Sequence, residues 1–542
     1  MDTTAPTRSP LRAGRREWLG MAVLALPTLL LSLDMSVLHL ALPHLAADLR
    51  PSSSELLWIM DVYGFMIAGF LITMGTLGDR IGRRRLLLIG AAAFGAASVA
   101  AAYAQTPAML IAARTVLGIA GATLMPSTLA LISNMFQDPR QRATAIAMWA
   151  SCFMGGTAIG PVVGGLLLEW FWWGSVFLLG VPVMVLLLAT APFLLPEHRD
   201  PRAGRLDLFS VALSLAAILP VVYGLKQVAA DGPGAGAFAA IAAGAAIGAF
   251  FVRRQLRMPD PLLDLRLFTD RGFSTGLGVM MLGALAMGGM FLLLSQYLQL
   301  VGGLTPLEAG LRLVAPSVLM IAATMLGPWA ARKLGGANVI GGGMVLAAAG
   351  MLLLTQAAPA GGTLLAIVAL AAASLGLGPG AALVTDVVVG AAPPHKAGSA
   401  ASMSETSGEF GIAMGVALLG SLSTAVYRGR VTVPDGVPAD AAAAARDSLA
   451  AAVAAAAELP AGAAAQLLAP AREAFTHSLQ ATALLGAAVL GAFGLVAILL
   501  LRTRPPQPAE AGAGGPEDSG DAAEPAPEAV PASWPESVPA DR

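Results

Sequence analysis

Four acidic side chains interrupt long apolar runs of the sequence and are the first candidates for chemistry. Asp34 and Asp61 lie in the first two runs, and Glu405 and Glu409 lie four positions apart in a late one. A carboxylate at the middle of a bilayer costs at least ~2.5 to 3.5 kcal/mol on insertion scales, so acids there are functional candidates. The spacing of Glu405 and Glu409 places both on one helix face, about 12 and 18 Å from its start.

One cation within the apolar runs accompanies these acids. Arg114 lies in the fourth run, at a depth similar to that expected for Asp34, so we expect the two to meet directly or through water. The pair is either a proton-coupling element or a structural ion pair. Asp61, expected near a helix end, is either functional or a solvated acid. Glu405 and Glu409 have no obvious cation on their own helix.

The chemistry of buried carboxyl groups suggests an exchange reaction. Burial and a neighbouring like charge both favour the protonated form of a carboxyl near neutral pH. An ionised acid in an apolar, aromatic-lined cavity also suits a lipophilic cation. If proton and cation compete for one acid, binding of either releases the other, which is antiport. The aromatic candidates are Trp58, Tyr63 and Trp149, although Trp58 also fits an interfacial belt.

The composition indicates that lipid is the main solvent of the elements that position these residues. Hydrophobic residues make up 56% of the 542 and charged residues 12%, with a mean hydropathy of +0.74. The apolar runs are long enough to cross a hydrocarbon core of about 30 Å as helices. We predict an all-α, polytopic membrane protein with 14 transmembrane helices. The predicted helices span 17–41, 56–78, 86–104, 107–135, 142–168, 173–195, 206–226, 235–253, 272–300, 308–330, 338–357, 362–390, 397–427 and 478–501.

These helices group as six, two and six. The expected parts are a cytoplasmic N-terminal segment (1–16), an N-terminal half (17–195), two linker helices (206–253), a C-terminal half (272–501) and a disordered cytoplasmic tail (505–542). The C-terminal half includes an Ala-rich extracellular loop, 430–475, which is expected to form one or two short helices.

The charge of the loops predicts the orientation. Loops after even-numbered helices are rich in arginine and lysine, whereas the opposite loops carry few cations, among them Arg50 and Lys226. Positively charged loops stay in the cytoplasm. We therefore expect a multi-pass protein of the inner (plasma) membrane with both termini in the cytoplasm.

Motifs typical of other classes of protein are missing from the sequence. It has no metal-ligand cluster, no Walker-type loop and no GxSxG elbow. We expect no enzyme activity, no cofactor and no metal. The expected partners are small-molecule cations, protons and the lipid bilayer, without nucleic acid, and we expect a monomer.

The loop GTLGDRIGRRR resembles the signature between helices 2 and 3 of the major facilitator superfamily. The matching residues are Gly75, Asp79, Arg80, Gly82 and Arg83. The resemblance implies a gate, in which Asp79 pairs with Arg83 or with the N-terminus of a helix from the other half. The alternative is that the arginines only anchor the topology.

The segment GGTAIGPVVGG is similar to the fifth-helix motif of exporters in the same superfamily. Its small residues permit close helix packing and a bend. The motif residues are Gly156, Gly160, Pro161, Gly164 and Gly165. LDMSVLHLALP, beginning at Leu33, and ARTVLGIAGA, which contains Arg114, also resemble the fourteen-helix drug:proton antiporter branch. Leu117 departs from that pattern, because relatives often carry a polar residue there.

Within that branch the chain resembles exporters of quaternary ammonium compounds and methyl viologen, through ELLWIMDVYGFMIAG and SETSGEFG. This resemblance implies multidrug efflux by alternating access. The implied proton-coupling residues are Asp34, Arg114 and Glu409. The implied substrate-binding residues are Asp61, Glu405, Glu409, Trp58, Tyr63 and Trp149. His39 is either a proton relay or a packing residue. The tenth helix lacks an acid that some relatives carry, so we expect monovalent cations to be handled better than bis-cations.

Two alternatives remain open at this point. One is a proton-coupled exporter dedicated to a single endogenous metabolite or antibiotic on the same scaffold. The other is a transport-inactive membrane sensor or scaffold, which the intact coupling and gate motifs disfavour. Substrate breadth in an efflux assay separates the first from a multidrug exporter.

Overall fold

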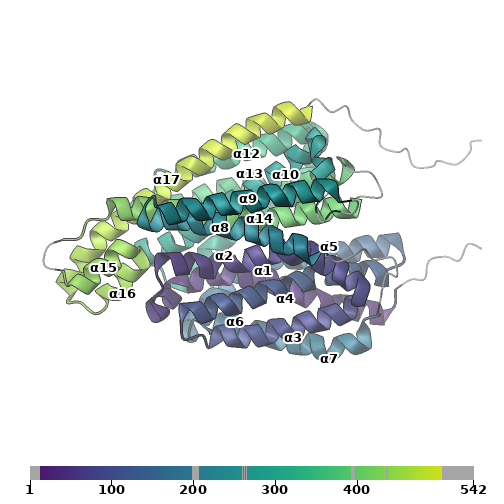
Figure 1. Ribbon diagram of the computed structural model, residues 1–542, viewed down its shortest axis with the longest axis horizontal. Coiled ribbons are helices and arrows are strands. Elements are labelled where there is room, and N and C mark those ends of the chain that lie inside the picture. Colours follow the sequence, from purple (N-terminus) through teal and green to yellow (C-terminus); the bar gives the residue numbers. More distant parts are fainter. Residues whose placement is uncertain are drawn as a thin grey trace, which may run out of the picture. The chain divides into compact units, whose positions relative to one another are not determined.

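A computed structural model describes residues 13–197, 207–258, 265–359, 361–391, 397–434 and 437–502, together with 261 and 263 (Figure 1). This part of the chain is helical and contains no β-strand. It includes 14 helical spans long and apolar enough to cross a membrane. The prediction of an all-α, polytopic membrane protein is confirmed. The predicted tail, 505–542, and most of the predicted segment 1–16 lie outside the described residues.

The helices follow one another with short connections. Their bounds are α1 Arg15–Leu49, α2 Ser53–Ile81, α3 Arg83–Ala102, α4 Pro107–Met135, α5 Pro139–Trp170, α6 Ser175–Leu178, α7 Gly180–Leu194, α8 Leu208–Asp231, α9 Ala235–Arg257, η1 Leu265–Thr269, α10 Arg271–Gln296, η2 Tyr297–Val301, α11 Pro306–Leu334, α12 Gly336–Leu354, α13 Thr363–Ala391, α14 Ala397–Arg430, α15 Ala439–Asp447, α16 Leu449–Ala456 and α17 Ala461–Arg502.

Local sequence signals set several helix starts. Ser52 caps α2 by accepting a hydrogen bond from the Glu55 amide, and the Glu55 side chain accepts one from the Ser52 amide. Thr305 and Glu308 form the same reciprocal cap at α11. Such capping boxes satisfy amides that a helix leaves unpaired at its first turn. These ends are therefore determined by sequence rather than by the limits of the apolar runs.

Most helix ends lie within a few residues of the prediction, but four of the predicted helices differ more. α1 continues to Leu49 instead of residue 41, because Pro43 is accommodated inside the helix, as prolines often are in membrane helices. α8 continues to Asp231 instead of residue 226. The sixth predicted helix is interrupted at Leu179. α17 begins at Ala461 instead of 478, because its first turns pack against α16 and η2, so the loop expected at 430–475 is shorter.

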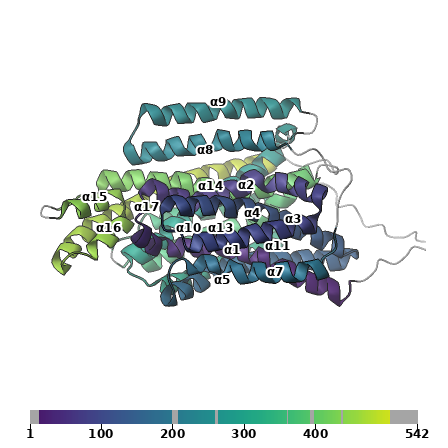
Figure 2. The same cartoon turned by 60° about the horizontal axis from the view of Figure 1, so that its bottom comes forward.

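The helices pack as two groups joined by a linker pair. α1–α7 pack against one another, as do α10–α14 and α17, and the two groups touch along α5 with α11 and along α2 with α14. The linker helix α8 packs against α2, α14 and α9. Figure 2 shows α8 and α9 side by side, with α9 the outermost. α8 therefore contacts both groups, whereas α9 packs mainly on α8.

Two ends of the helix bundle are useful reference points. We call the end with Arg83 and the start of α10 the basic end. The end with α15 and α16, visible at the left of Figure 1, is called the insertion end. α2 runs from the insertion end to the basic end, and α14 runs in the opposite direction, so Asp61 lies nearer the insertion end than Phe65 does.

Candidate functional site

Asp34 and Arg114 form a buried ion pair between α1 and α4. Arg114 Nη1 lies 3.1 Å from Asp34 Oδ2, and the side chains are 2% and 8% exposed. Arg114 Nε also donates to the Ile59 carbonyl of α2 at 3.2 Å. The expected contact is therefore present, and Asp34 lies near the middle of α1 because the helix is longer than predicted. A role for the pair in proton coupling stays a prediction.

Tyr63 of α2 lies between this pair and the C-terminal half. Its buried ring is 4.3 Å from the Arg114 guanidinium carbon, a cation–π contact. Its hydroxyl interacts electrostatically with Asp34 and Glu409 and makes no hydrogen bond to the described residues. Tyr63 thus lies close to both the ion pair and Glu409 of α14.

Glu405 and Glu409 lie on α14 where it faces the N-terminal half. Glu409 is 6% exposed, and Glu405 is half-buried and repels it. In the described part of the chain neither forms an ion pair, and Glu409 Oε2 makes no hydrogen bond. The helices are close here, because a β-carbon on Gly64 of α2 would lie 3.0 Å from Ala413 of α14. The two acids are therefore adjacent, with Glu409 buried and Glu405 half-buried, and neither has a paired cation among the described residues.

Asp61 of α2 is paired with Lys226 of α8, which sequence analysis had placed in an outer loop. Lys226 Nζ lies 2.8 Å from Asp61 Oδ2, and the side chains are 1% and 0% exposed. The loop assignment of Lys226 was wrong, as was the reading of Asp61 as a solvated acid. The apolar residues Val228–Ala230, before Gly232-Pro233, are the signal that α8 continues past the lysine.

The three aromatic candidates are not brought together. Trp58 lies on Lys226, with the ring centroid 3.9 Å from Nζ. Trp149 donates from Nε1 to Thr128 Oγ1 at 3.2 Å, and Thr128 lies about 21 Å further along α4 than Arg114. Trp149 is therefore not part of a site with the acids, contrary to the prediction.

His39 of α1 lies at the contact with α10. Its ring meets Phe291 edge-on with centroids 5.2 Å apart. Ser295 donates a hydrogen bond to the His39 carbonyl at 2.9 Å. This setting supports the packing role among the two that the sequence left open.

An apolar cavity lies between the two halves, on the basic-end side of Asp61. Its volume is about 380 Å³, and α2, α8, η1, α10 and α14 contribute to its walls. The lining includes Phe65, Phe268, Phe410, Met281 and Met403. Aromatic rings and flexible methionines suit apolar molecules of varied shape. Among the described residues, no group of three or more His, Cys, Asp or Glu side chains could hold a metal ion.

The signature loop between α2 and α3 is tied within its own half. Arg83 binds Asp79 with Nε–Oδ1 at 2.7 Å. Gly82 has φ +109°, and a β-carbon there would lie 2.3 Å from Glu197 Oε1, so glycine is required. Glu197 also accepts from the Arg84 amide at 3.2 Å. Asp79 pairs with Arg83, which is one of the two expected partners, and its function as a gate stays a prediction.

The glycine motif of α5 contacts two helices. A β-carbon on Gly156 or Gly160 would overlap Ser32 or Ser36 of α1. A β-carbon on Gly165 would lie 2.6 Å from the Leu307 Cα of α11, in the other half. The small residues thus allow close packing within the N-terminal half and between the halves.

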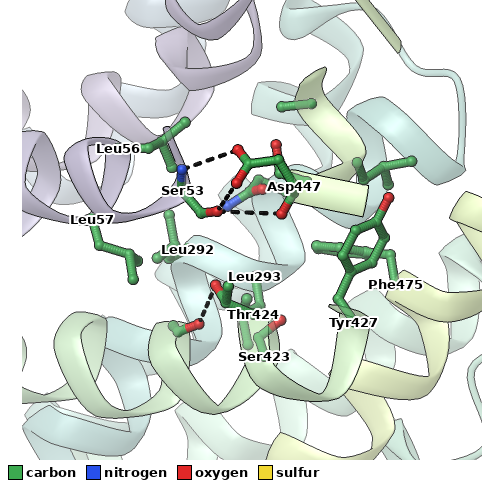
Figure 3. Close-up of a pocket in the computed structure, with 15 residues that line it drawn as sticks. Ser53, Leu56, Leu57, Leu292, Leu293, Ser423, Thr424, Tyr427, Asp447 and Phe475 are labelled. Carbon is green, nitrogen blue, oxygen red and sulfur yellow. Dashed lines mark hydrogen bonds between the residues drawn. The ribbon is translucent and has the colours of Figure 1, made fainter. Parts of the chain in front are cut away.

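A polar cluster joins the halves at the insertion end. Ser53 of α2 donates from Oγ and from its amide to Asp447 at 2.8 and 3.1 Å, and Arg428 of α14 pairs with the same carboxylate. Figure 3 shows Ser53 and Asp447 beside Tyr427, whose hydroxyl donates to the Ala445 carbonyl at 2.7 Å. The end of α15 is therefore fixed to both halves.

The described part of the chain combines 14 membrane-length helices with buried ion pairs and acids where its halves meet, an arrangement typical of membrane transport proteins. The chain belongs to the Major Facilitator Superfamily, whose family model matches residues 24–416. It is therefore a multi-pass inner-membrane transporter and not an enzyme, as the sequence resemblance predicted.

Sequence relatives and a solved structure support this assignment. The chain is 44% identical over 508 residues to the multidrug efflux pump LfrA of Mycolicibacterium smegmatis, covering 92% of this chain and 99% of that protein. It is 35% identical over 473 residues to the methyl viologen resistance protein SmvA of Salmonella typhimurium, covering 85% and 94%. A bacterial homolog of the human lysosomal transporter Spinster, solved inward-facing and unoccupied, superposes with a TM-score of 0.64 at 16% identity, covering 92% of this chain and all of that chain. That structure shows the fold alone.

Proposed function

We propose that this protein exports lipophilic cations, quaternary ammonium compounds among them, in exchange for protons by alternating access. The observation that carries the proposal is the Glu405–Glu409 pair on α14. Glu409 is buried, Glu405 is half-buried beside it, and neither has an ion-pair partner among the described residues. Such a pair can accept either a proton or an organic cation.

Competition at this pair supplies the exchange. With both carboxylates charged, each repels the other, and a proton or a substrate cation relieves the repulsion. A site that cannot hold both at full occupancy releases one when the other binds. Binding of a cation from one side of the membrane would therefore release a proton, and protonation from the other side would release the cation.

The cavity supports a lipophilic substrate. Its lining combines phenylalanine and methionine with the hydroxyls of Ser214, Ser274 and Ser407, and no acid is among the described residues that line it. An apolar body would occupy this volume while its cationic group turns toward an acid. The names of the two relatives refer to multidrug efflux and to resistance to methyl viologen, an organic cation.

The Asp34–Arg114 pair is the proposed coupling element of the N-terminal half. Protonation of Asp34 would break its attraction to Arg114 and free a cation that joins α1, α2 and α4. Tyr63 would then transmit the change toward Glu409. We further propose that the protein acts as a monomer with the basic end and both termini in the cytoplasm, following the distribution of arginine and lysine.

The test is ethidium efflux from energised cells that express wild type, Asp34→Asn, Glu409→Gln or Glu169→Gln at matched levels, with and without a protonophore. Glu169→Gln changes an exposed acid of α5 and serves as the control. We expect protonophore-sensitive efflux from wild type and control, and at least tenfold slower efflux from both site variants.

Other outcomes reassign the function. Wild-type cells that move neither ethidium nor any other lipophilic cation would favour an exporter dedicated to one metabolite or antibiotic. Full activity of Asp34→Asn would remove Asp34 from proton coupling. Efflux that persists with protonophore but stops on ATP depletion would overturn proton exchange.

A further inference from the structure

The residues around the Lys226 ammonium resemble a binding site for an organic cation. Its ammonium touches a carboxylate, Asp61, and faces the ring of Trp58 at 3.9 Å. Val62, next to Asp61, and Val222, one turn before Lys226, are apolar and are 5% and 1% exposed. A carboxylate together with a tryptophan face is the arrangement that recognises quaternary ammonium groups. Here a side chain of the same polypeptide fills it.

A second lysine–tryptophan contact shows what is unusual about the first. Lys333 lies 4.5 Å from the Trp329 centroid on α11, but both residues are exposed, and Lys333 forms no ion pair with a described residue. Exposed contacts of this kind are worth about 0.5 to 1 kcal/mol. Lys226 and Asp61 are removed from solvent, so the charge of each must be balanced within the protein. While Asp61 is ionised, the Asp61–Trp58 site therefore needs a cation.

We propose that Lys226 is a tethered competitor, a built-in cation that occupies the Asp61–Trp58 site until a cationic substrate displaces it. This inference rests on the proposed function, because it assigns that function a second cation site and a residue that tunes its specificity. The substrate class is an organic ammonium whose head fits between a carboxylate and one indole ring.

The position of the site relative to the cavity supports displacement. α8 lines the cavity with Ser214, Leu215 and Ile218, and Lys226 lies about 12 Å further along the same helix. Asp61 is about one helical turn from Phe65, which also lines the cavity. An amphiphilic cation with its apolar body in the cavity would therefore bring its head close to the ammonium of Lys226.

The residue type also fits this role. Of the 32 lysines and arginines in the chain, only Lys226, Lys333 and Lys396 are lysines. Arginine would bind Asp61 through a rigid two-pronged contact, whereas lysine presents a compact charge on a flexible stem. A lysine is thus easier to displace by a substrate of similar charge.

The alternative is a purely structural tether that holds the linker helix against the N-terminal half. Both readings predict that Lys226 matters for stability, but only competition predicts that its removal strengthens cation binding. If Lys226 fills the site about nine-tenths of the time, its removal raises the apparent affinity about tenfold. A tether predicts no gain.

The test measures binding of benzyltrimethylammonium to purified full-length protein in detergent. The set is wild type, Lys226→Met, Lys226→Arg, Lys226→Met/Asp61→Asn and Lys226→Met/Trp58→Leu, with Lys333→Met as the control on the exposed lysine–tryptophan pair. We expect about tenfold tighter binding to Lys226→Met. We expect loss of that gain in both double variants, and no gain in Lys226→Arg or Lys333→Met.

A second measurement uses wild type, so it does not depend on the folding of a variant. Reductive methylation with mass spectrometry is followed with and without saturating benzyltrimethylammonium. We expect Lys226 to be protected at first and at least fivefold more modified with the cation, while Lys333 is modified equally in both. Protection of Lys226 that persists while the cation binds, or unchanged affinity of a folded Lys226→Met, overturns the proposal. Ethidium efflux by the same wild-type protein, measured in parallel, shows whether the proposed function itself has failed.

Discussion

The acidic side chains on the two sides of the contact between α2 and α14 differ in their partners. On the N-terminal side, Asp34 and Asp61 each face a cation at 3.1 and 2.8 Å. On α14, Glu405 and Glu409 face each other, and no ion pair involves them in the described part of the chain. In the first arrangement the protein itself supplies the balancing cation, whereas in the second a proton or a substrate cation must supply the positive charge.

This difference teaches which acids exchange partners readily. Removing the cation from a buried ion pair lowers the stability of the protein by several kcal/mol, so the charge state of such an acid is coupled to the packing of the helices. Two adjacent acids without a cation gain from any positive charge that arrives. We therefore expect the paired acids to dominate stability and the unpaired acids to dominate substrate and proton exchange.

The largest expected effect comes from breaking a pair. Arg114→Met leaves Asp34 buried without its cation and should destabilise the protein by about 3 to 5 kcal/mol. The apparent Tm in detergent, from thermal melts followed by size-exclusion chromatography, checks this. The double variant Asp34→Asn/Arg114→Met removes both charges and should recover part of the lost stability. An apparent Tm of Arg114→Met equal to that of wild type would contradict the expectation that the paired acids dominate stability.

For an acid of α14 we expect little change in stability and a large loss of proton exchange. Glu409→Gln removes a like charge and no ion pair, so the melting temperature should stay at or above that of wild type while cation-coupled proton release falls at least tenfold. Proton release on adding ethidium to weakly buffered, purified protein measures this. A large loss of stability in Glu409→Gln would show that its carboxylate has a structural partner.

The contact between the halves can be tested separately from charge. Gly165→Ala places a methyl group against the backbone of α11 and should cost about 1 to 3 kcal/mol and slow efflux. Gly155→Ala is the matched control in the same motif, because no atom lies within 4 Å of its added carbon. It should be neutral or stabilise by up to about 1 kcal/mol. Similar losses in both variants would mean that helix bending, not the contact, explains the motif.

The smallest expected effect concerns substrate charge. α11 carries no acid beyond Glu308 in its first turn, so this helix adds no second anion to the Glu405–Glu409 pair. A mono-quaternary antiseptic should therefore be exported several-fold faster than a bis-quaternary one of similar lipophilicity. Competition with ethidium efflux, titrated with each compound, measures the ratio. Equal potency would place a second anionic contact elsewhere.

The sequence predicted most of the fold and the acids of the site, for a physical reason. Charged residues stand out in apolar runs, so Asp34, Arg114, Glu405 and Glu409 were visible without a structure. Lys226 was missed because a lysine near the end of an apolar run resembles a loop cation. Its assignment needed the partner, Asp61, which is 165 positions away.

The lengths of α1 and α17 were missed for another reason. Pro43 and the polar residues after Ala461 look like boundaries in one dimension, but neighbouring helices keep both segments helical. The separation of Trp149 from the acids was also missed, because it depends on the level at which α5 meets α4, and Trp149 meets Thr128 about 21 Å from Arg114. Packing between helices, rather than propensity within them, decided these points.

The outermost helix carries a consequence for how this protein can change over time. α9 packs mainly on α8, and its exposed side chains include Phe238, Phe250 and Leu256, which are 50% or more exposed. Few positions on it are constrained by a neighbour, so most apolar replacements should be tolerated in a mutational scan. α8, one layer inward, should tolerate few. Within a single hairpin, sequence drift should therefore be fast on one helix and slow on the other.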